Sequence, residues 1–120
     1  MDQHILQLVK NFSEKLKISV PEFQELREAK QALESDQTSS QLWNMREEQR
    51  LTIELMKNKS LPVSAEQEDT YRETLKQMRE NPITMRYLKA INFANKISGK
   101  IGAELYDQIG ADFAPRKGCA

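Results

Sequence analysis

The sequence has very few of the residues from which catalytic and metal sites are usually built. Its 120 residues include one cysteine, Cys119, and one histidine, His4. A single cysteine cannot form an internal disulfide, and we expect His4, near the start of the sequence, to be solvated. None of the patterns HExxH, CxxC, GxGxxG, GxSxG or GKS/T occurs, which argues against the chemistries they serve. We therefore predict no enzymatic activity, no catalytic residues, no cofactor and no metal site.

The sequence is also poor in helix breakers and has no net charge. It contains four glycines and four prolines, and 18 basic residues balance 18 acidic ones. Its many Glu, Lys, Gln, Leu and Met residues favour helices because they lose little rotamer freedom there. No apolar run approaches the roughly 18 residues of a membrane span, and no leader peptide pattern opens the chain. We expect a cytoplasmic helical protein without a membrane segment or a strong overall attraction to nucleic acid.

The stretch from Asn81 to Ile109 carries the strongest helical pattern. Asn81 is a preferred N-cap, and Pro82 falls at the first helical position, where its missing N–H costs nothing. Apolar residues follow at spacings of three and four and so form a stripe along one side. This helix would be about 42 Å long, whereas a compact globule of this chain length is roughly 35 Å across. The pattern indicates an elongated bundle, or a partner that covers the excess length.

Two helices are predicted before the middle of the chain. The first covers about 3–17 and places an apolar face along one side. The second covers about 20–34, and Ser19 and Glu22 have the spacing of a capping box at its start. The apolar face of the first helix consists of Ile5, Leu8, Val9, Phe12 and Leu16.

Two more helices are predicted between these and the last one. The third covers about 37–58, and Asp36 either caps it or marks a bend within one longer helix. The fourth covers about 65–80 after the loop NKSLPVS, with Ser64 and Gln67 spaced as a capping box. Its apolar stripe is thin, so we expect it to be the most weakly buried element.

These segments together predict an all-α protein. The fold is an elongated antiparallel helical bundle of four to five helices with a long C-terminal helix. We expect a single helical domain over residues 1–110 and a flexible C-terminal tail over residues 111–120, where proline, glycine and charged residues gather.

The third predicted helix is apolar on more than one side. Leu51 and Leu55 point nearly opposite to its main apolar side, and Trp43 lies between the two. A helix of this kind either contacts two neighbours or leaves one apolar side partly exposed. In so small a protein the second neighbour would be another subunit.

Two further surfaces are predicted on the last helix. One carries Arg86, Lys89, Lys96 and Lys100 around Phe93, and could bind RNA phosphates, meet an acidic partner or simply be solvated. From residue 83 onward six basic and three acidic residues give a net charge of +3, which leaves −3 for the rest. The other surface carries small residues, which permit close approach of a second helix or are tolerated weak points near a helix end. The predicted dimer or partner interface consists of Trp43, Leu51, Leu55, Leu88, Gly99, Gly102 and Tyr106.

The order of these segments resembles the bacterial YlbF/YmcA family of small helical regulators. The resemblance covers about Ile5 to Ile109 and includes the pattern SxPEFQELxxAKxALESD that ends at Asp36, followed by NPITMRYLKAINFANKISGKIGAELYDQI. It implies a non-enzymatic helical bundle that dimerises through its long helices. It also implies complexes with related helical proteins or with a ribonuclease assembly in messenger RNA maturation, and a role in competence, biofilm formation and sporulation.

The resemblance also raises the question of a metal site, because some members carry an iron–sulfur cluster on cysteine-rich tails. Cys119 is the only thiol here, whereas such a cluster normally takes four. We therefore expect a homodimeric regulator that acts by protein–protein contact. The alternatives are a small RNA-associated protein that uses the basic residues, and a subunit that contributes Cys119 to a shared metal site. The sequence does not identify the partner or the pathway.

Overall fold

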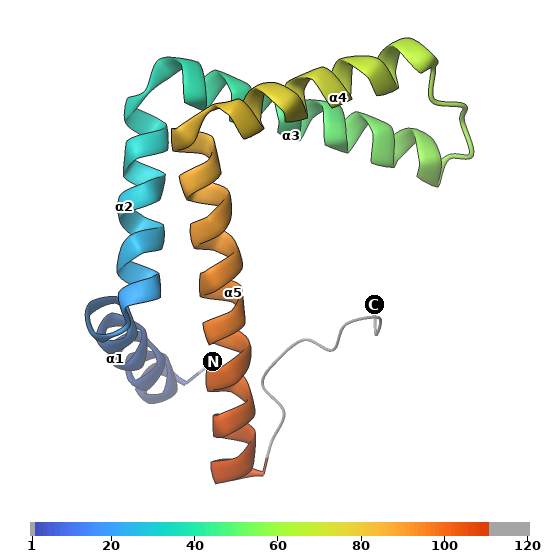
Figure 1. The fold of residues 1–120 in the computed structure, drawn as a ribbon. Coiled ribbons are helices and arrows are strands. Elements are labelled where there is room, and N and C mark those ends of the chain that lie inside the picture. The colour runs from blue at the N-terminus through green and yellow to red at the C-terminus, as the bar shows by residue number, and fades with distance from the viewer. Residues whose placement is uncertain (1, 111–120) are drawn as a thin grey trace. The chain divides into compact units, whose positions relative to one another are not determined.

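A computed structural model describes residues 2–110 and folds them into five α-helices (Figure 1). No strand occurs within these residues, so the predicted all-α class and the long C-terminal helix are confirmed. None of the helices is long and apolar enough to cross a membrane. The helices are α1 (Gln3–Ser19), α2 (Pro21–Ser35), α3 (Gln37–Asn58), α4 (Ala65–Glu80) and α5 (Pro82–Ile109).

Polar side chains mark the starts of the last three helices, as the sequence indicates. Ser64 and Gln67 form a reciprocal capping box at α4, with both hydrogen bonds 3.0 Å long. Asp36 has extended backbone and accepts a hydrogen bond from the Ser39 N–H at α3. Asn81 accepts hydrogen bonds from the first N–H groups of α5. Of the two alternatives for Asp36, the structure therefore has the helix cap and not a bend in one long helix.

The predicted capping box of Ser19 and Glu22 is wrong. Ser19 is the last residue of α1, and α2 begins at Pro21 after the single residue Val20. A residue before proline avoids the helical region because the proline ring clashes with it, and Val20 is accordingly extended, with φ −101° and ψ 113°. Its N–H donates to the carbonyl of Leu16 and closes the last turn of α1.

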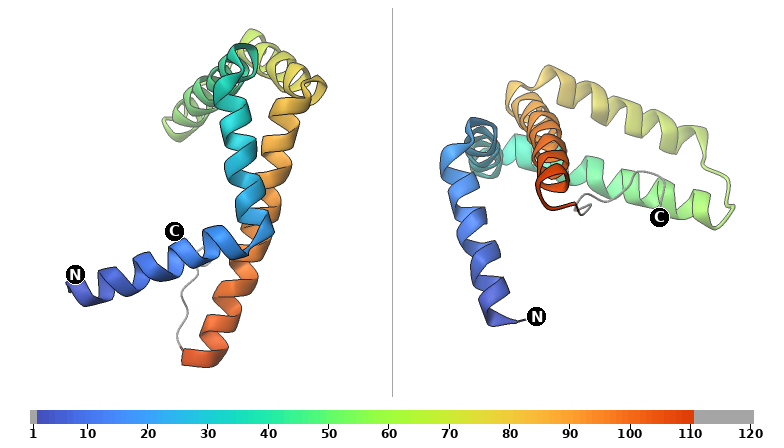
Figure 2. Two further views of the ribbon diagram at one scale, coloured as in Figure 1. Left: turned by 90° about the vertical axis from the view of Figure 1, so that its left-hand side faces the viewer. Right: turned by 90° about the horizontal axis from the view of Figure 1, so that it is seen from below.

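The chain divides into two compact units, and α2 and α5 contribute to both. Residues 27–88 form one unit, in which α3 and α4 run side by side as a hairpin (Figures 1 and 2). Its interior combines apolar and small polar residues, and Ser39 and Thr84 have no exposed surface. The buried side chains of this unit are Ala29, Leu33, Ser39, Leu42, Thr74, Met78 and Thr84.

The other unit contains α1, the first turns of α2, and α5 from Lys89 onward. Ala90 and Ala94, one turn apart on α5, are buried. In contrast, α1 has no buried residue, and the views in Figure 2 show it leading away from α5. The expectation that α4 is the most weakly buried helix is therefore wrong, because α4 buries Thr74 and Met78.

Candidate interaction surfaces

A buried polar cluster joins the starts of α3 and α5 within the unit of residues 27–88. The Ser39 hydroxyl donates to Asp36 at 2.5 Å, and the amide nitrogen of Asn81 donates to the Ser39 oxygen at 3.0 Å. The Thr84 hydroxyl donates to the carbonyl of Met78 at 2.6 Å. These bonds lower the pKa of Asp36, chiefly through the Ser39 hydroxyl and then through the Ser39 N–H. The cluster satisfies polar groups at the starts of α3 and α5 and links the two helices.

Trp43 lies beside this cluster and is already engaged within the chain. Its ring centroid is 4.8 Å from that of Tyr87, with the planes tilted by 56°. The guanidinium of Arg46 lies 5.4 Å from the Trp43 ring centroid. Trp43 and Leu88, both predicted to be interface residues, are half-buried. Trp43 therefore helps to hold α3 and α5 together here and offers only part of its surface to a partner.

Leu51 and Leu55 form the apolar surface of α3 that the sequence predicts. They are 55% and 53% exposed and lie one helical turn apart. Neither leucine lines the groove of about 320 Å³ between α3 and α4, whose lining includes Ile53, Glu48 and Glu66. The exposed leucines are available to a partner even though α3 already packs against α4.

Ion pairs stiffen the adjoining surface of α3. Glu47 contacts Arg46 at 2.6 Å and Arg50 at 3.0 Å, and Arg50 also contacts Glu54 at 2.9 Å. The hydrogen bond from Arg50 is the main reason that the pKa of Glu47 is lowered, and the same bond raises the pKa of Arg50. Arg46, Glu47 and Arg50 are half-buried and only Glu54 is exposed, so these pairs lie at the edge of the packed part of α3.

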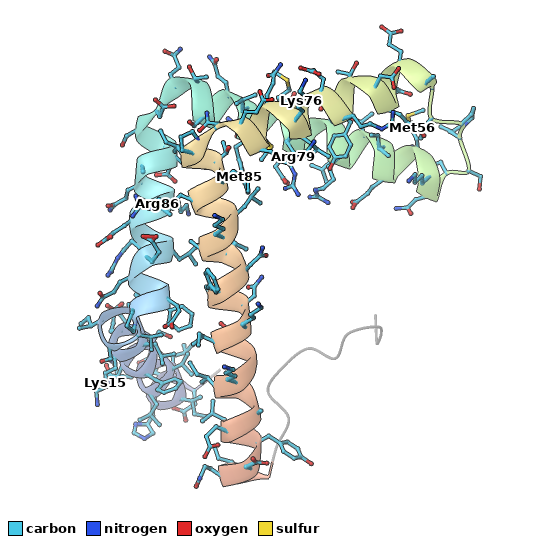
Figure 3. The ribbon with its side chains drawn as sticks, in the orientation of Figure 1. Lys15, Met56, Lys76, Arg79, Met85 and Arg86 are labelled. Atoms are coloured by element: carbon cyan, nitrogen blue, oxygen red, sulfur yellow. The ribbon has the colours of Figure 1, made fainter. Side chains whose placement is uncertain are left out.

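The four basic residues that were predicted to form one surface on α5 differ in their contacts. Arg86 forms an ion pair with Glu28 of α2 at 3.6 Å, and Figure 3 labels it on the side of α5 that faces α2. Lys89, Lys96 and Lys100 are exposed and form no ion pair within residues 2–110. The Lys96 ammonium lies 5.7 Å from the ring centroid of Phe93, which is 55% exposed. Lys89, Lys96, Lys100 and Phe93 are thus all exposed on α5.

The small-residue surface of α5 is open in the single chain. A Cβ atom built at Gly99 meets no atom within 4 Å. Gly102 is half-buried and Tyr106 is 48% exposed. The backbone at Gly99 is therefore accessible to a neighbouring helix.

The sequence analysis did not identify the apolar face of α1 as an exposed surface. The sequence predicts this face correctly, but the structure leaves it uncovered. Its four main residues are between 44% and 56% exposed, and Leu16 is half-buried. A periodic pattern indicates which side chains share a face; it does not say whether the same chain covers that face. The four residues are Ile5, Leu8, Val9 and Phe12.

The remaining predicted site residue, Cys119, lies outside the described residues, as do two of the six basic residues counted from residue 83 onward, Arg116 and Lys117. Within residues 2–110, no group of three or more His, Cys, Asp or Glu side chains could hold a metal ion. His4 is exposed at the start of α1, as expected.

The described part of the chain thus belongs to the class of small all-α proteins that present exposed helix faces. The sequence model of a family described as "Control of competence regulator ComK, YlbF/YmcA" matches residues 5–109. The chain belongs to this family. No curated protein and no solved structure matches it.

Proposed function

We propose that the protein is a non-enzymatic regulator that acts as an adaptor through protein–protein contacts. Membership of a family of competence-control proteins supports a regulatory role. The observation that carries the adaptor mechanism is the exposure of Leu51 and Leu55 on a helix that is already packed against α4 and α5. Leucines at this spacing are the anchors by which one helix face enters a groove of another protein.

The partners follow from the family resemblance. We propose that they are related helical proteins or subunits of a ribonuclease assembly, and that the complex acts in competence, biofilm or sporulation control. The exposed backbone at Gly99, together with Tyr106, supports an additional close contact with a helix of another subunit. We place this activity in the cytoplasm.

Affinity capture from the native host, read by mass spectrometry, tests the adaptor role. The tagged wild-type chain should capture related helical proteins or ribonuclease subunits. A variant with Leu51→Ser and Leu55→Ser should lose them because both anchors lose their apolar surface. Leu61→Ser is the matched control, since Leu61 is also a half-exposed leucine (50%) but lies in the loop after α3. Equal capture by all three chains contradicts the proposed surface.

A second candidate function is direct RNA binding through the exposed lysines of α5. The position of Lys96 over the ring of Phe93 favours it, because bases stack on aromatic rings while lysines neutralise phosphates. Replacing Lys96 and Lys100 by Glu should abolish a salt-sensitive interaction with single-stranded RNA. Replacing the exposed Lys57 and Lys59 of the α3 end by Glu makes the same change in charge and should leave RNA binding intact. Binding that survives the first pair of substitutions excludes this function.

A further inference from the structure

Three lysines and one phenylalanine form a straight row along α5, all of them exposed. They follow one another at spacings of four, three and four positions, so they fall within about 60° around the helix axis. At the helical rise the row is about 16 Å long. It lies entirely within one of the two compact units. The members of this α5 row are Lys89, Phe93, Lys96 and Lys100.

The α5 row carries positive charge that the chain does not neutralise. None of its lysines forms an ion pair within residues 2–110. The Lys96 ammonium lies over the ring of Phe93, 5.7 Å from its centroid, so one charge is placed at the aromatic ring itself. Asp107 lies on the same side of the helix two turns after Lys100, and its carboxylate ends the positive region. The charge therefore favours an anionic occupant whose contact ends before Asp107.

The ring of Phe93 selects among anionic occupants. It is 55% exposed in the middle of the row, whereas Ala90 and Ala94 beside it are buried, so the ring lies outside the packed side of α5. Single-stranded nucleic acid uses both features, because a base stacks on the ring while lysines neutralise the neighbouring phosphates. A duplex uses only the charge, since its bases are already paired and stacked. An acidic peptide also gains no stacked base.

We propose that the α5 row binds a single-stranded segment of RNA, with one base stacked on Phe93 and the backbone running along the helix between Lys89 and Lys100. The inference deepens the second candidate function and rests on it. It names the form of RNA, and it makes Phe93 the residue that distinguishes a single strand from a duplex. Recognition by charge and stacking tolerates any base sequence, because every base has a π-face.

Fluorescence anisotropy of the full chain with a short fluorescein-labelled oligouridylate measures the contribution of charge. Three neutralised phosphates give a slope of about −2 when log affinity is plotted against log salt concentration. Replacing Lys89, Lys96 or Lys100 by Gln should reduce the steepness by about 0.7 in each case. Lys76→Gln removes the same charge from an exposed position on α4 and should leave the slope unchanged. Equally tight binding of a poly-glutamate peptide overturns the proposal in favour of an acidic protein partner.

An abasic oligomer, which keeps the phosphates but has no bases, isolates the contribution of stacking. The wild type should bind oligouridylate at least about fivefold more tightly than the abasic oligomer. Phe93→Leu should remove this preference, because leucine is apolar but has no ring, and it should leave the affinity for an RNA duplex unchanged. Tyr106→Leu is the matched control: Tyr106 is 48% exposed on α5 but lies on a different side of the helix, so the preference should remain.

Failure of this inference is distinguishable from failure of RNA binding itself. Oligouridylate binding that is weakened by the lysine substitutions but unchanged in Phe93→Leu overturns the stacked single strand and leaves RNA binding in place. Absence of oligouridylate binding by the wild type overturns both. Circular dichroism should show the same helix content in every variant, because all the substituted side chains are exposed.

Discussion

Ser39 and Asn81 are 42 positions apart in the sequence, and their side chains are hydrogen-bonded at 3.0 Å. Asn81 also caps α5 by accepting from the N–H groups of Ile83 and Thr84 at 2.9 and 3.2 Å. One side chain thus both starts the longest helix and ties it to the start of α3. Because Ser39 has no exposed surface, water cannot replace a lost partner there without rearrangement.

Replacing Asn81 by Ala should lower the free energy of unfolding by about 1–3 kcal/mol, the sum of a lost helix cap and a lost hydrogen bond to the buried Ser39 oxygen, whose hydroxyl still donates to Asp36. Urea denaturation followed by circular dichroism measures this loss. Asn44→Ala is the control, because Asn44 is exposed within α3 and alanine is a better helix former there. Equal stability of the Asn81 variant and the wild type would show that the cluster contributes nothing.

The hydroxyl and the methyl group of Thr84 should make separate contributions to the free energy of unfolding. Thr84→Val removes the bond to the Met78 carbonyl and should cost about 1 kcal/mol, since that carbonyl keeps a second donor in the Asn81 N–H. Thr84→Ser keeps the hydroxyl, so it should retain this hydrogen bond while losing methyl packing. A double-mutant cycle with Asn81→Ala separates the two contributions. Full additivity would contradict a shared cluster.

Stability should fall in acid because of Asp36. Its pKa lies below the ordinary value through hydrogen bonds from Ser39, so the unfolded chain binds more protons than the folded chain in the acid range. The free energy of unfolding should therefore rise with pH and level off above the pKa of the unfolded carboxyl, about 4. Glu47, lowered in pKa by Arg50, acts in the same direction.

Urea denaturation at a series of pH values checks this dependence. Asp36→Asn should be less stable than the wild type at neutral pH, and the difference should shrink as the pH falls through the folded pKa of Asp36. Asp107→Asn removes an equal charge from an exposed position on α5 and serves as the control. Parallel stability curves for wild type and Asp36→Asn would contradict the assignment.

Substitutions at Gly99 should show whether a second helix contacts α5. In the single chain Gly99→Ala should stabilise the helix by about 0.5–1 kcal/mol, because alanine fills open space there. Gly99→Leu adds a larger side chain at a position where a Cβ atom meets nothing within 4 Å, and it should weaken self-association if a second helix approaches closely. Thermal unfolding and sedimentation together measure both effects. Unaltered sedimentation of Gly99→Leu would count against a close contact at this site.

Much of the fold can be predicted from the sequence because its signals are local. The loop before α4 and the starts of α3, α4 and α5 follow from capping residues and proline, whose effects extend over a few positions. The start of α2 was assigned wrongly because Ser19 has the right spacing for a capping box, while the steric effect of Pro21 on Val20 decides the outcome.

Exposure is harder to predict, because it depends on which other elements cover a face. The patterns of α1 and α4 suggested the wrong order of burial: α4 has fewer apolar residues but packs against α3, while α1 has a fuller stripe and no buried residue. The pairing of Ser39 with Asn81 is likewise absent from any local pattern. In the sequence each residue is recognisable only as one near the start of a helix. The starts of α3 and α5 come together only when the chain folds.

Single residues make three of the four connections between helices: Val20, Asp36 and Asn81. One inserted residue at any of these positions would either change the direction of the following helix or shift its register by one residue, which turns the side chains by about 100° around the helix axis. The connection between α3 and α4 is longer and exposed, and loops of this kind absorb insertions at small cost. Differences in length among relatives should therefore gather between α3 and α4, which is also the place where a reporter domain can be inserted.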